Sequence, residues 1–554
     1  MKHPIRLFLF LLLLAPAAWG RETPAAAKEL VAKVDEIFAP WSSRESPGCA
    51  VAVGENGRTL VSRAYGMADL EHDAANTPET VFEAGSVSKQ LTTAAVLLLA
   101  QQGKLSVQDD VRKHVPELPD YGTPITIDHL IHHTSGLRDW GAVVGLAGWP
   151  RGTRIHNHSH VLDVISKQKS LNYAPGAEFS YTNSGYNLLA MIVERVSGQT
   201  FSEFTRKNLF EPLGMTRTQW RDDFTRVVKG RAIAYRGGEG SFHSEMPFEN
   251  VFGNGGLLTT VGDLLLWNEN LVTGKVGGAA FLEEMHRRGR LNDGREIEYA
   301  RGLFVLDWKG VPEVSHGGAT AGYRAFLARY PEQRLSLAVL CNAAEADPGD
   351  LGHRAIDLFL AGRGNAPVAA STPPSGIVAL APEVLAARAG LYRNVLTGEP
   401  MKVEVKEGKL RTGRGTELIP LSESQFQVDE NRRVAFDVGP DGRPKGMRLI
   451  HRSGEVISFE PAAEIKPTPD RLAEYAGEYR SDEAEVTYRV LMENGQLTLR
   501  LPLGSFPLAP SYADAFQAPQ GWLVRFYRDG EGRITDLGVG VGRVRDLRFQ
   551  RIAQ

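Results

Sequence analysis

The C-terminal third of the chain contains the same residue pattern twice. AGLY begins at position 389 and AGEY at 476, and EGKL and NGQL, which begin at 407 and 494, keep the same spacing of 87. Turn-forming residues separate short alternating runs throughout both copies, which is typical of a small up-and-down barrel or a sandwich. Because two copies are too few for a solenoid, the repeat predicts two similar β domains in tandem, at 382–466 and 467–554.

The segment before the repeat mixes helix and strand patterns up to about residue 363. CAVAVGENGRTLVSRAYGMAD, starting at residue 49, predicts two strands joined by a turn at ENG. Further helices are predicted at 87–102, 185–197, 259–271 and 349–361, and further strands at 302–308, 322–330 and 335–341. The simplest fold is α+β: an antiparallel sheet built from both ends of the segment and flanked by helices, with a helical insertion between them.

A change in composition separates the two regions. GRGNAPVAASTPPSG, starting at residue 362, consists mostly of Gly, Pro, Ala and Ser and has almost no apolar anchor. We therefore expect a linker at 364–381, after a first domain at 21–363. A chain of 554 residues is too long for one hydrophobic core, which agrees with several domains.

The chain begins with a pattern typical of a secretory signal peptide. Two basic residues precede an apolar run from Leu7 to Ala18, and the small residue Gly20 stands before a possible cleavage point. The run is too short to span a bilayer comfortably, and an uncleaved anchor is the alternative. We therefore expect residues 1–20 to be removed and the mature protein to be periplasmic or secreted.

The chain contains two cysteines, Cys49 and Cys341, which are too few for a disulfide scaffold. Each lies in an apolar, strand-like run, so we expect two buried free thiols. A single bridge is the alternative. It requires the two strands to be neighbours and the compartment to be oxidising.

FEAGSVSKQL, starting at residue 82, places a serine and a lysine three residues apart at the start of an apolar helix. Ser86 and Lys89 share one face of that helix. Burial and the positive helix N-terminus disfavour the ammonium, so we expect a lowered pKa and a neutral amine that can take the serine proton. A capping serine beside a snorkelling lysine is the alternative. The same spacing recurs at Ser166 and Lys169 in a polar context.

Tyr181 and Asn183 lie in YAPGAEFSYTNSGY, a loop that ends where an amphipathic helix begins. A loop supported by a rigid helix is a common position for functional side chains. A phenol near a lysine can ionise more easily and relay a proton, and the asparagine amide can donate to and accept from a substrate amide. An ordinary turn is the alternative.

Glycines follow a histidine in VSHGGATAGYRAFLARYP, which starts at residue 314. The glycines after His316 let a substrate backbone approach a strand edge closely, and such an edge can bind an extended peptide as an added strand. A glycine-rich hairpin turn with a chance histidine is the alternative.

In this order, Ser-x-x-Lys, Tyr-x-Asn and His-x-Gly resemble the motifs of the serine β-lactamase and penicillin-binding-protein superfamily. ITIDHLIHHTSGL, PLGM and GNGGLLTTVGDLLLW are similar to stretches of its branch of class C β-lactamases, esterases and D-aminopeptidases, the S12-type peptidases. The resemblance covers about residues 30–363 and implies a β-lactamase/transpeptidase-like domain with a helical subdomain. The histidine in the third motif and the tandem β domains further resemble D-aminopeptidases, whose C-terminal domains are lipocalin-like barrels.

The resemblance implies roles for individual residues. Ser86 would be the acylated nucleophile, with Lys89 and Tyr181 as a coupled acid/base pair. The backbone N–H groups of Ser86 and Ala319 would form the oxyanion hole. The substrate-binding positions would be Asn183, His316, Gly318 and Ala319.

The third motif departs from that of β-lactamases proper, which usually begins with a lysine that attracts a substrate carboxylate. His316 is mostly neutral at pH 7, which favours substrates without a free carboxylate near the cut. We therefore expect an exported serine hydrolase that acts on a small peptide, amide or ester. Peptidoglycan fragments and β-lactams are further candidate partners. The alternative is a penicillin-binding sensor that is acylated in the same cleft with little turnover.

We expect no cofactor and no metal. HNHSH at 156–160 lacks a partnering cysteine or carboxylate motif, so we interpret it as a solvated loop. The net charge of −3 gives no excess of positive charge that would bind nucleic acid, so we expect no nucleic-acid partner. No pattern indicates an oligomeric state.

Overall fold

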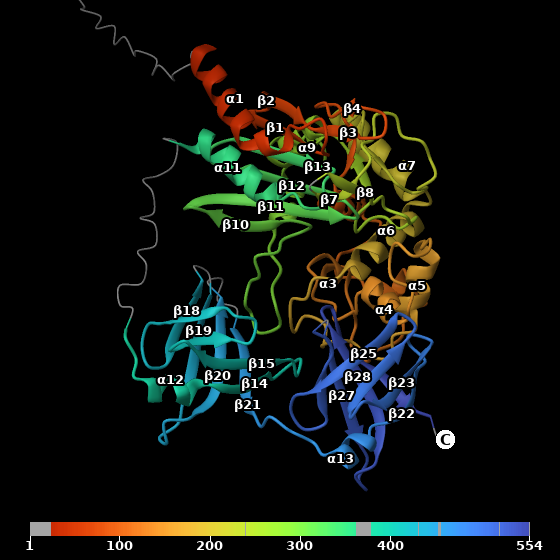
Figure 1. The fold of residues 1–554 in the computed structure, drawn as a ribbon. Coiled ribbons are helices and arrows are strands. Elements are labelled where there is room, and N and C mark those ends of the chain that lie inside the picture. The colour runs from red at the N-terminus through yellow and green to blue at the C-terminus, as the bar shows by residue number, and fades with distance from the viewer. Residues whose placement is uncertain are drawn as a thin grey trace, which may run out of the picture.

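The chain folds into three bodies, a helix-and-sheet domain and two β-barrels that lie beside each other below it in Figure 1. The computed structural model describes residues 24–238, 240–361, 378–429, 432–451, 456–519 and 521–552. The signal peptide expected at 1–20 and most of the linker expected at 364–381 lie outside these residues.

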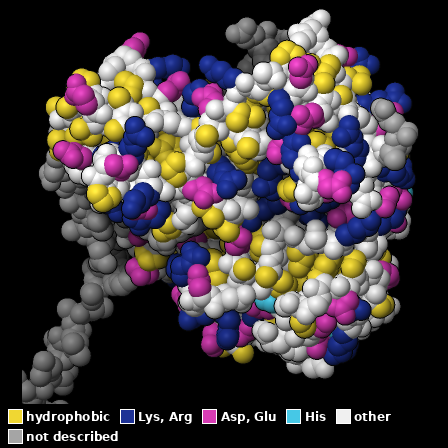
Figure 2. Space-filling model, turned by 90° about the horizontal axis from the view of Figure 1, so that it is seen from below, with side chains coloured by type: hydrophobic (Ala, Val, Ile, Leu, Met, Phe, Trp, Pro, Cys, Tyr) yellow, Lys and Arg dark blue, Asp and Glu magenta, His cyan; other side chains and the backbone are white. Residues whose placement is uncertain are grey.

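Acidic and basic side chains are interspersed on the face shown in Figure 2. Within the described ranges, every helix is too short or too polar to cross a membrane.

Both ends of the first domain contribute to one six-stranded antiparallel sheet, as the residue pattern predicts. Its strand order is β10-β11-β12-β13-β1-β2. The strands are β1 (Cys49–Glu55), β2 (Arg58–Tyr65), β10 (Phe304–Trp308), β11 (Val311–Thr320), β12 (Tyr323–Tyr330) and β13 (Leu335–Cys341). The helices packed on the sheet are α1 (Pro24–Phe38), α2 (Ser88–Gln101), α9 (Val261–Thr273) and α11 (Pro348–Leu360).

Strand β1 is buried on both faces of the sheet. Side chains alternate between the two faces of a strand. Val51 and Val53 join the core that includes α1 and α11, whereas Ala50 and Ala52 join the larger core that includes α2 and α9. All four side chains are fully buried. The continuous apolar run in GCAVAV therefore reflects a strand covered by helices on both sides.

The expectation of two free thiols is wrong, because Cys49 and Cys341 form a disulfide. Strands β1 and β13 are antiparallel neighbours, and these two cysteines are directly opposed in the register. The pairing depends on strand order across 292 residues of chain, which the local pattern around each cysteine does not contain.

Replacing both cysteines by alanine is expected to lower the free energy of unfolding of the first domain by about 2–4 kcal/mol, because the bridge closes a very long loop. Denaturant unfolding followed by tryptophan fluorescence measures this, since Trp522 is the only tryptophan beyond Trp308. Wild-type protein in a thiol reductant is the control and should approach the variant. An unchanged midpoint in the double variant contradicts a stabilising bridge.

The insertion between β2 and β10 forms the helical part of the domain. Its central helix is α2, whose residues from Ser88 to Leu99 are all buried. The other helices are α3 (Ile127–Ile131), α4 (Trp140–Leu146), α5 (His158–Ser166), α6 (Asn183–Ser197), α7 (Phe201–Thr205), α8 (Glu211–Leu213) and α10 (Gly278–His286), with short turns at η2 (Gly85–Val87), η3 (Val111–Lys113) and η4 (Arg206–Phe210). A further short turn, η1 (Ala39–Trp41), follows α1 outside this insertion. Short strands are β3 (Met67–Asp69), β4 (Ala74–Ala75), β5 (Phe82–Glu83), β6 (Gln219–Trp220), β7 (Tyr235–Gly238), β8 (Ser241–Ser244) and β9 (Leu257–Thr259).

The tandem repeat forms two closed eight-stranded barrels, so the sandwich alternative is wrong. The first contains α12 (Pro382–Arg388), β14 (Gly390–Asn394), β15 (Pro400–Lys406), β16 (Lys409–Thr412), β17 (Glu417–Pro420), β18 (Gln425–Asp429), β19 (Arg432–Val438), β20 (Pro444–His451) and β21 (Val456–Ala462). The second contains α13 (Pro469–Ala473), β22 (Gly477–Ser481), β23 (Val486–Glu493), β24 (Gln496–Leu501), β25 (Gly504–Pro510), β26 (Ala515–Gln517), β27 (Leu523–Arg528), β28 (Ile534–Val541) and β29 (Val544–Arg551).

The repeat preserves details as well as topology. Tyr392 and Tyr479 are equivalent residues of AGLY and AGEY, and both are buried. Each phenol donates a hydrogen bond to the carbonyl oxygen four residues earlier, at 2.8 and 2.7 Å. The same tyrosine therefore ties the first strand to the last residue of the short helix in the first barrel and to the turn just after that helix in the second.

The second barrel packs against the helical part of the first domain. Val143 and Leu146 of α4 belong to the same apolar cluster as the barrel interior. The Tyr488 hydroxyl donates to the carbonyl oxygen of Leu146 at 2.6 Å. Arg138 and Glu483 form an ion pair across the contact at 3.3 Å, and both are buried. This docking holds one end of the second barrel close to the first domain.

Candidate active site

Ser86 lies in the tight turn η2, between β5 and α2. Gly85 has φ of +51°, and a Cβ at this position would lie 2.6 Å from the backbone nitrogen of Ala319. A Cβ on Gly318 would clash with the carbonyl oxygen of Ala84. Two glycines therefore let strand β11 approach the start of the helix, so that the backbone N–H groups near Ser86 and Ala319 face the same space.

Lys89 is fully buried and donates three hydrogen bonds. Its Nζ lies 3.1 Å from Ser86 Oγ, 3.0 Å from Asn183 Oδ1 and 2.7 Å from the carbonyl oxygen of Asn254. Burial holds the pKa of the Lys89 amine well below its ordinary value, and the positive charge of Arg543 lowers it further. The amine next to the serine is therefore suited to accept a proton.

Tyr181 lies on the same wall of the site. Its ring centroid is 4.8 Å from Lys89 Nζ, and its hydroxyl forms a side-chain hydrogen bond with Ser86. The expectation that the lysine eases ionisation of this phenol is wrong in direction. Burial raises the pKa of Tyr181, and this effect exceeds the lowering by the hydrogen bond from Ser86. The hydroxyl therefore remains a proton donor at neutral pH.

Asn183 is the first residue of α6, with Thr182 as the N-cap. Its backbone N–H donates to Asp139 Oδ2 at 2.8 Å, while its side-chain oxygen accepts from Lys89. These two hydrogen bonds fix the backbone and the side-chain oxygen of Asn183. The side-chain amide nitrogen remains available to the cavity that Asn183 lines.

His316 is buried in the middle of β11. Its Nε2 lies 3.2 Å from the Tyr299 hydroxyl, and its Nδ1 lies 2.5 Å from the carbonyl oxygen of Gly317. Burial lowers the pKa of His316 to about 3, and the nearby Lys89 adds to this effect. The imidazole is therefore neutral at neutral pH and supplies no fixed cation to the third motif.

The end of β11 offers a free strand edge. Strand β10 pairs with β11 only as far as Phe304 opposite Ser315, whereas β12 pairs with β11 up to Thr320. In the described part of the sheet, residues 316–320 therefore have a strand partner on one side alone. The other side faces the cavity, where a substrate backbone can align as an added strand.

A cavity of about 600 Å³ joins these groups. It is lined by both sequence motifs around Ser86 and Tyr181 and by the end of β11. Residues that the sequence patterns do not predict also line it: Arg151, Asn254, Phe304, Phe326, Asp347 and Arg543. Of these, Asn254 lies in the quoted stretch GNGGLLTTVGDLLLW and Phe326 lies in the quoted stretch VSHGGATAGYRAFLARYP, whereas neither arginine lies in any recognisable pattern.

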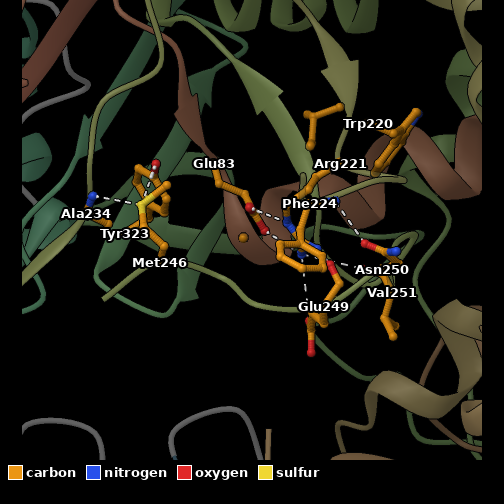
Figure 3. Close-up of polar contacts among 12 residues, drawn as sticks. Glu83, Trp220, Arg221, Phe224, Ala234, Met246, Glu249, Asn250, Val251 and Tyr323 are labelled. Carbon is orange, nitrogen blue, oxygen red and sulfur yellow. Dashed lines mark hydrogen bonds and ion pairs between the residues drawn. The ribbon is translucent and has the colours of Figure 1, made fainter. Parts of the chain in front are cut away.

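Buried charged residues link the strand before Ser86 to the cavity, and Figure 3 shows three of them, Glu83, Arg221 and Glu249. Glu83, three residues before Ser86, accepts two hydrogen bonds from the Arg221 guanidinium, at 2.8 and 3.1 Å. Arg221 also donates to the backbone carbonyl of Glu249, whose carboxylate holds Arg151 at the cavity. Glu83 and Arg221 are each 1% exposed. The polar chain therefore links the strand before Ser86 to a cavity residue.

The interpretation of HNHSH as a solvated loop is wrong for its first residues. His156 is fully buried, and His158 begins α5, where its Nε2 accepts from the backbone N–H of Phe252 at 3.2 Å. Burial lowers the pKa of His158 to about 4. Among the described residues, the cluster with metal-ligand spacing is instead Asp69, Glu71 and His72, which is largely exposed.

Comparison with known proteins places this site in a family. The family model described as Beta-lactamase matches residues 27–361. A D-aminopeptidase from Brucella ovis is 26% identical over 537 residues, which cover 92% of this chain and 96% of that protein.

Solved structures share the fold. The octameric penicillin-binding protein homologue from Pyrococcus abyssi has a TM-score of 0.54 and 24% identity, and the match covers 78% of this chain and 99% of that one. The D-amino acid amidase from Ochrobactrum anthropi, complexed with L-phenylalanine amide, has a TM-score of 0.51 and 20% identity, covering 61% of this chain and all of that one. The chain therefore belongs to the beta-lactamase family, as a serine hydrolase of the S12 type.

Proposed function

We propose that this hydrolase cleaves D-amino amides, peptides or esters through an acyl-enzyme on Ser86. The observation that carries the proposal is the convergence of the Ser86 hydroxyl, the buried Lys89 amine at 3.1 Å and the Tyr181 hydroxyl at one cavity. The relative named D-aminopeptidase, which matches both the first domain and the repeat region, supports a D-amino substrate.

The chemistry follows from the order of the groups. Neutral Lys89 takes the Ser86 proton as Oγ attacks the substrate carbonyl carbon. The backbone N–H groups of Ser86 and Ala319 donate to the oxygen that becomes negative. Tyr181, which keeps its proton, donates it to the leaving nitrogen or oxygen and is reprotonated through Lys89. Water then attacks the acyl-enzyme with the same pair acting as base.

Export of the mature chain is the second part of the proposal. The N-terminal pattern of a basic start, an apolar run and small residues supports it. The disulfide between Cys49 and Cys341 also supports it, because such bridges persist in the periplasm or outside the cell.

A panel of substrates tests the activity. D-alanine amide, L-alanine amide, a short ester and a chromogenic cephalosporin are offered to the purified protein, and product release is followed through many turnovers. We expect continued hydrolysis of the D-amide and no hydrolysis of the L-amide. One equivalent of product followed by arrest favours a penicillin-binding sensor, and equal rates on the two enantiomers contradict the D-amino assignment.

The pH profile of kcat/KM shows whether Lys89 or Tyr181 is the base. Only neutral Lys89 can accept a proton, so activity is lost as the pH falls through the pKa of Lys89. Because burial holds that pKa well below its ordinary value, the acidic limb should lie at a lower pH than an ordinary lysine amine would give. If Tyr181 were the base, activity would rise only in alkaline solution, since burial raises its pKa.

Tyr181→Phe is the matched variant for this profile. It should lower kcat by about 10²-fold to 10³-fold, because a positioned proton donor contributes that much, and should keep the acidic limb. Disappearance of the acidic limb in this variant would contradict Lys89 as the base.

A further inference from the structure

Arg543 reaches the cavity from the second barrel. Gly542 and Arg543 form the two-residue turn between β28 and β29, where Val541 pairs with Val544. The positive φ of Gly542, +49°, is what such a tight hairpin turn requires. The turn therefore places a basic side chain at the tip of a rigid hairpin.

The first domain holds this hairpin tip in place. Asn172 donates from Nδ2 to the carbonyl oxygen of Arg543 at 3.0 Å and accepts at Oδ1 from the backbone N–H of Arg545 at 2.8 Å. The Arg545 guanidinium pairs with Glu178 at 2.9 Å. Contacts on both sides of Arg543 thus fix its backbone, and its side chain projects into the cavity.

The Arg543 guanidinium has free hydrogen-bonding capacity. It lies 4.8 Å from the Tyr181 ring centroid and 3.5 Å from Asp139 Oδ2. The Asp139 oxygens already accept from the backbone N–H groups of Ala142 and Asn183, at 3.2 and 2.8 Å. Among the described residues, the ion pair of this guanidinium is the 3.5 Å contact with Asp139, and 45% of the Arg543 side chain stays exposed.

The charged residues of the cavity lining are Arg151, Arg543 and Asp347. Arg151 is held by the Glu249 carboxylate, with 2.9 Å between Nε and Oε2. Asp347 caps helix α11 by accepting from the backbone N–H of Asp350. The lining thus contains two arginines and one carboxylate, and the carboxylates that pair with the arginines, Glu249 and Asp139, do not themselves line the cavity.

We propose that Arg543 is a specificity-determining residue that binds a carboxylate of the substrate. A guanidinium presents paired donors that match a carboxylate. Arg543 is the more exposed of the two cavity arginines, and its ion pair with Asp139 is long, at 3.5 Å, whereas Arg151 lies 2.9 Å from Glu249. Within the proposed function, the preferred substrates are D-amino amides or peptides that carry an anionic group. A substrate whose only charge is an ammonium, such as D-alanine amide, is still cleaved but with a lower kcat/KM.

This inference revises the conclusion drawn from the third motif. The loss of lysine at His316 removes one cation, but the second barrel supplies another from a different wall, beside Tyr181. The barrel therefore belongs to the substrate site and not only to the packing of the chain.

Three p-nitroanilides test the inference: D-alanine, N-acetyl-D-alanine and N-succinyl-D-alanine p-nitroanilide, which are cationic, neutral and anionic. We expect the wild-type kcat/KM to be highest for the succinyl substrate. Arg543→Gln should lower that value by about 10-fold to 100-fold, mainly through KM, because hydrogen bonds to charged groups contribute about that much. The neutral substrate should change by less than about 3-fold.

A second pair, N-acetyl-D-alanyl-D-alanine and its C-terminal amide, shows whether the carboxylate belongs to the leaving group instead.

Two further variants serve as controls. Arg533→Gln makes the same change at another turn of the second barrel, in a side chain that is 70% exposed, and should leave all ratios unchanged. Arg543→Lys keeps the charge without the paired donors and should lose part of the preference. Because Arg543 also lowers the pKa of Lys89, rates are compared as ratios between substrates on the plateau of each pH profile.

Equal losses on all three p-nitroanilides in Arg543→Gln, or no loss at all, would overturn the inference.

Binding is measured separately by titrating N-succinyl-D-alanine into Ser86→Ala protein with and without Arg543→Gln. If binding depends on Arg543 but no substrate of the panel is cleaved, the proposed reaction fails and the carboxylate site stands. If the D-amides are cleaved but binding ignores Arg543, the reaction stands and the carboxylate site fails.

Discussion

Replacing Ser86 by alanine is expected to lower kcat for any cleaved D-amino amide by about 10⁴-fold or more. The Oγ of Ser86 is the atom that forms the acyl bond in the proposed reaction, and removing a nucleophile costs as much as removing the whole catalytic group. The variant should also fail to react with a fluorescent phosphonate. Ser86 lies on a turn and donates no hydrogen bond that the fold requires, so the protein should remain folded.

Ser166→Ala is the matched control. Ser166 has the same spacing to a lysine, Lys169, but it ends α5, and Lys169 pairs with Asp482 on the surface. This variant should keep wild-type turnover and phosphonate labelling. Retained labelling in Ser86→Ala, or its loss in Ser166→Ala, would contradict the assignment of the nucleophile.

Local patterns are sufficient to predict most of the architecture. The apolar run after Lys89 predicts a buried helix because its residues have no polar face, and α2 is buried from Ser88 to Leu99. The tandem repeat predicts two equal β domains because equal spacing of turns produces equal strands. Barrel closure, by contrast, depends on pairing of the first strand with the last, which is not a local property.

The predictions that the structure contradicts have one physical origin, which is contact between segments that lie far apart in the sequence. Free thiols were expected because Cys49 and Cys341 each lie in an apolar strand, and only the order of strands makes them neighbours. His156 was expected in solvent because its neighbours are polar, but its ring packs at 5.3 Å from that of Trp140. The ionisation of Tyr181 depends on burial by elements distant in sequence.

The site is predicted in part. The three motifs contribute Ser86, Tyr181 and His316 to the lining of one cavity. Lys89 lies next to it, 3.1 Å from Ser86 Oγ. The first two motifs lie at the starts of helices α2 and α6, and the third lies within strand β11. Arg543 lies more than 350 residues beyond Tyr181 and reaches it through the docking of a separate barrel. No sequence motif links residues so far apart in the chain. The presence of Arg543 in the cavity could therefore not be predicted from the motifs alone.

Replacing Glu83 by alanine is expected to lower the free energy of unfolding of the first domain by about 3–5 kcal/mol. The Arg221 guanidinium would keep its burial but lose both hydrogen bonds to the carboxylate, which leaves it the longer, 3.7 Å ion pair with Glu249. Removing one partner of a buried ion pair has about this cost. Arg231, whose Nη2 lies 3.5 Å from the same carboxylate, would lose its partner as well. Denaturant unfolding followed by tryptophan fluorescence measures the change, with the exposed neighbour Glu79→Ala as control.

The double variant Glu83→Leu/Arg221→Met separates charge pairing from packing. Both polar partners are removed together, and apolar side chains of similar length fill the space, so most of the lost stability should return. Activity should not return to the same extent, because Arg221 also donates to the backbone of Glu249, whose carboxylate holds Arg151 at the cavity. Stability and activity that recover together would show that the buried charges serve the fold alone. Recovery of stability with a persistently raised KM would show that they also position the cavity wall.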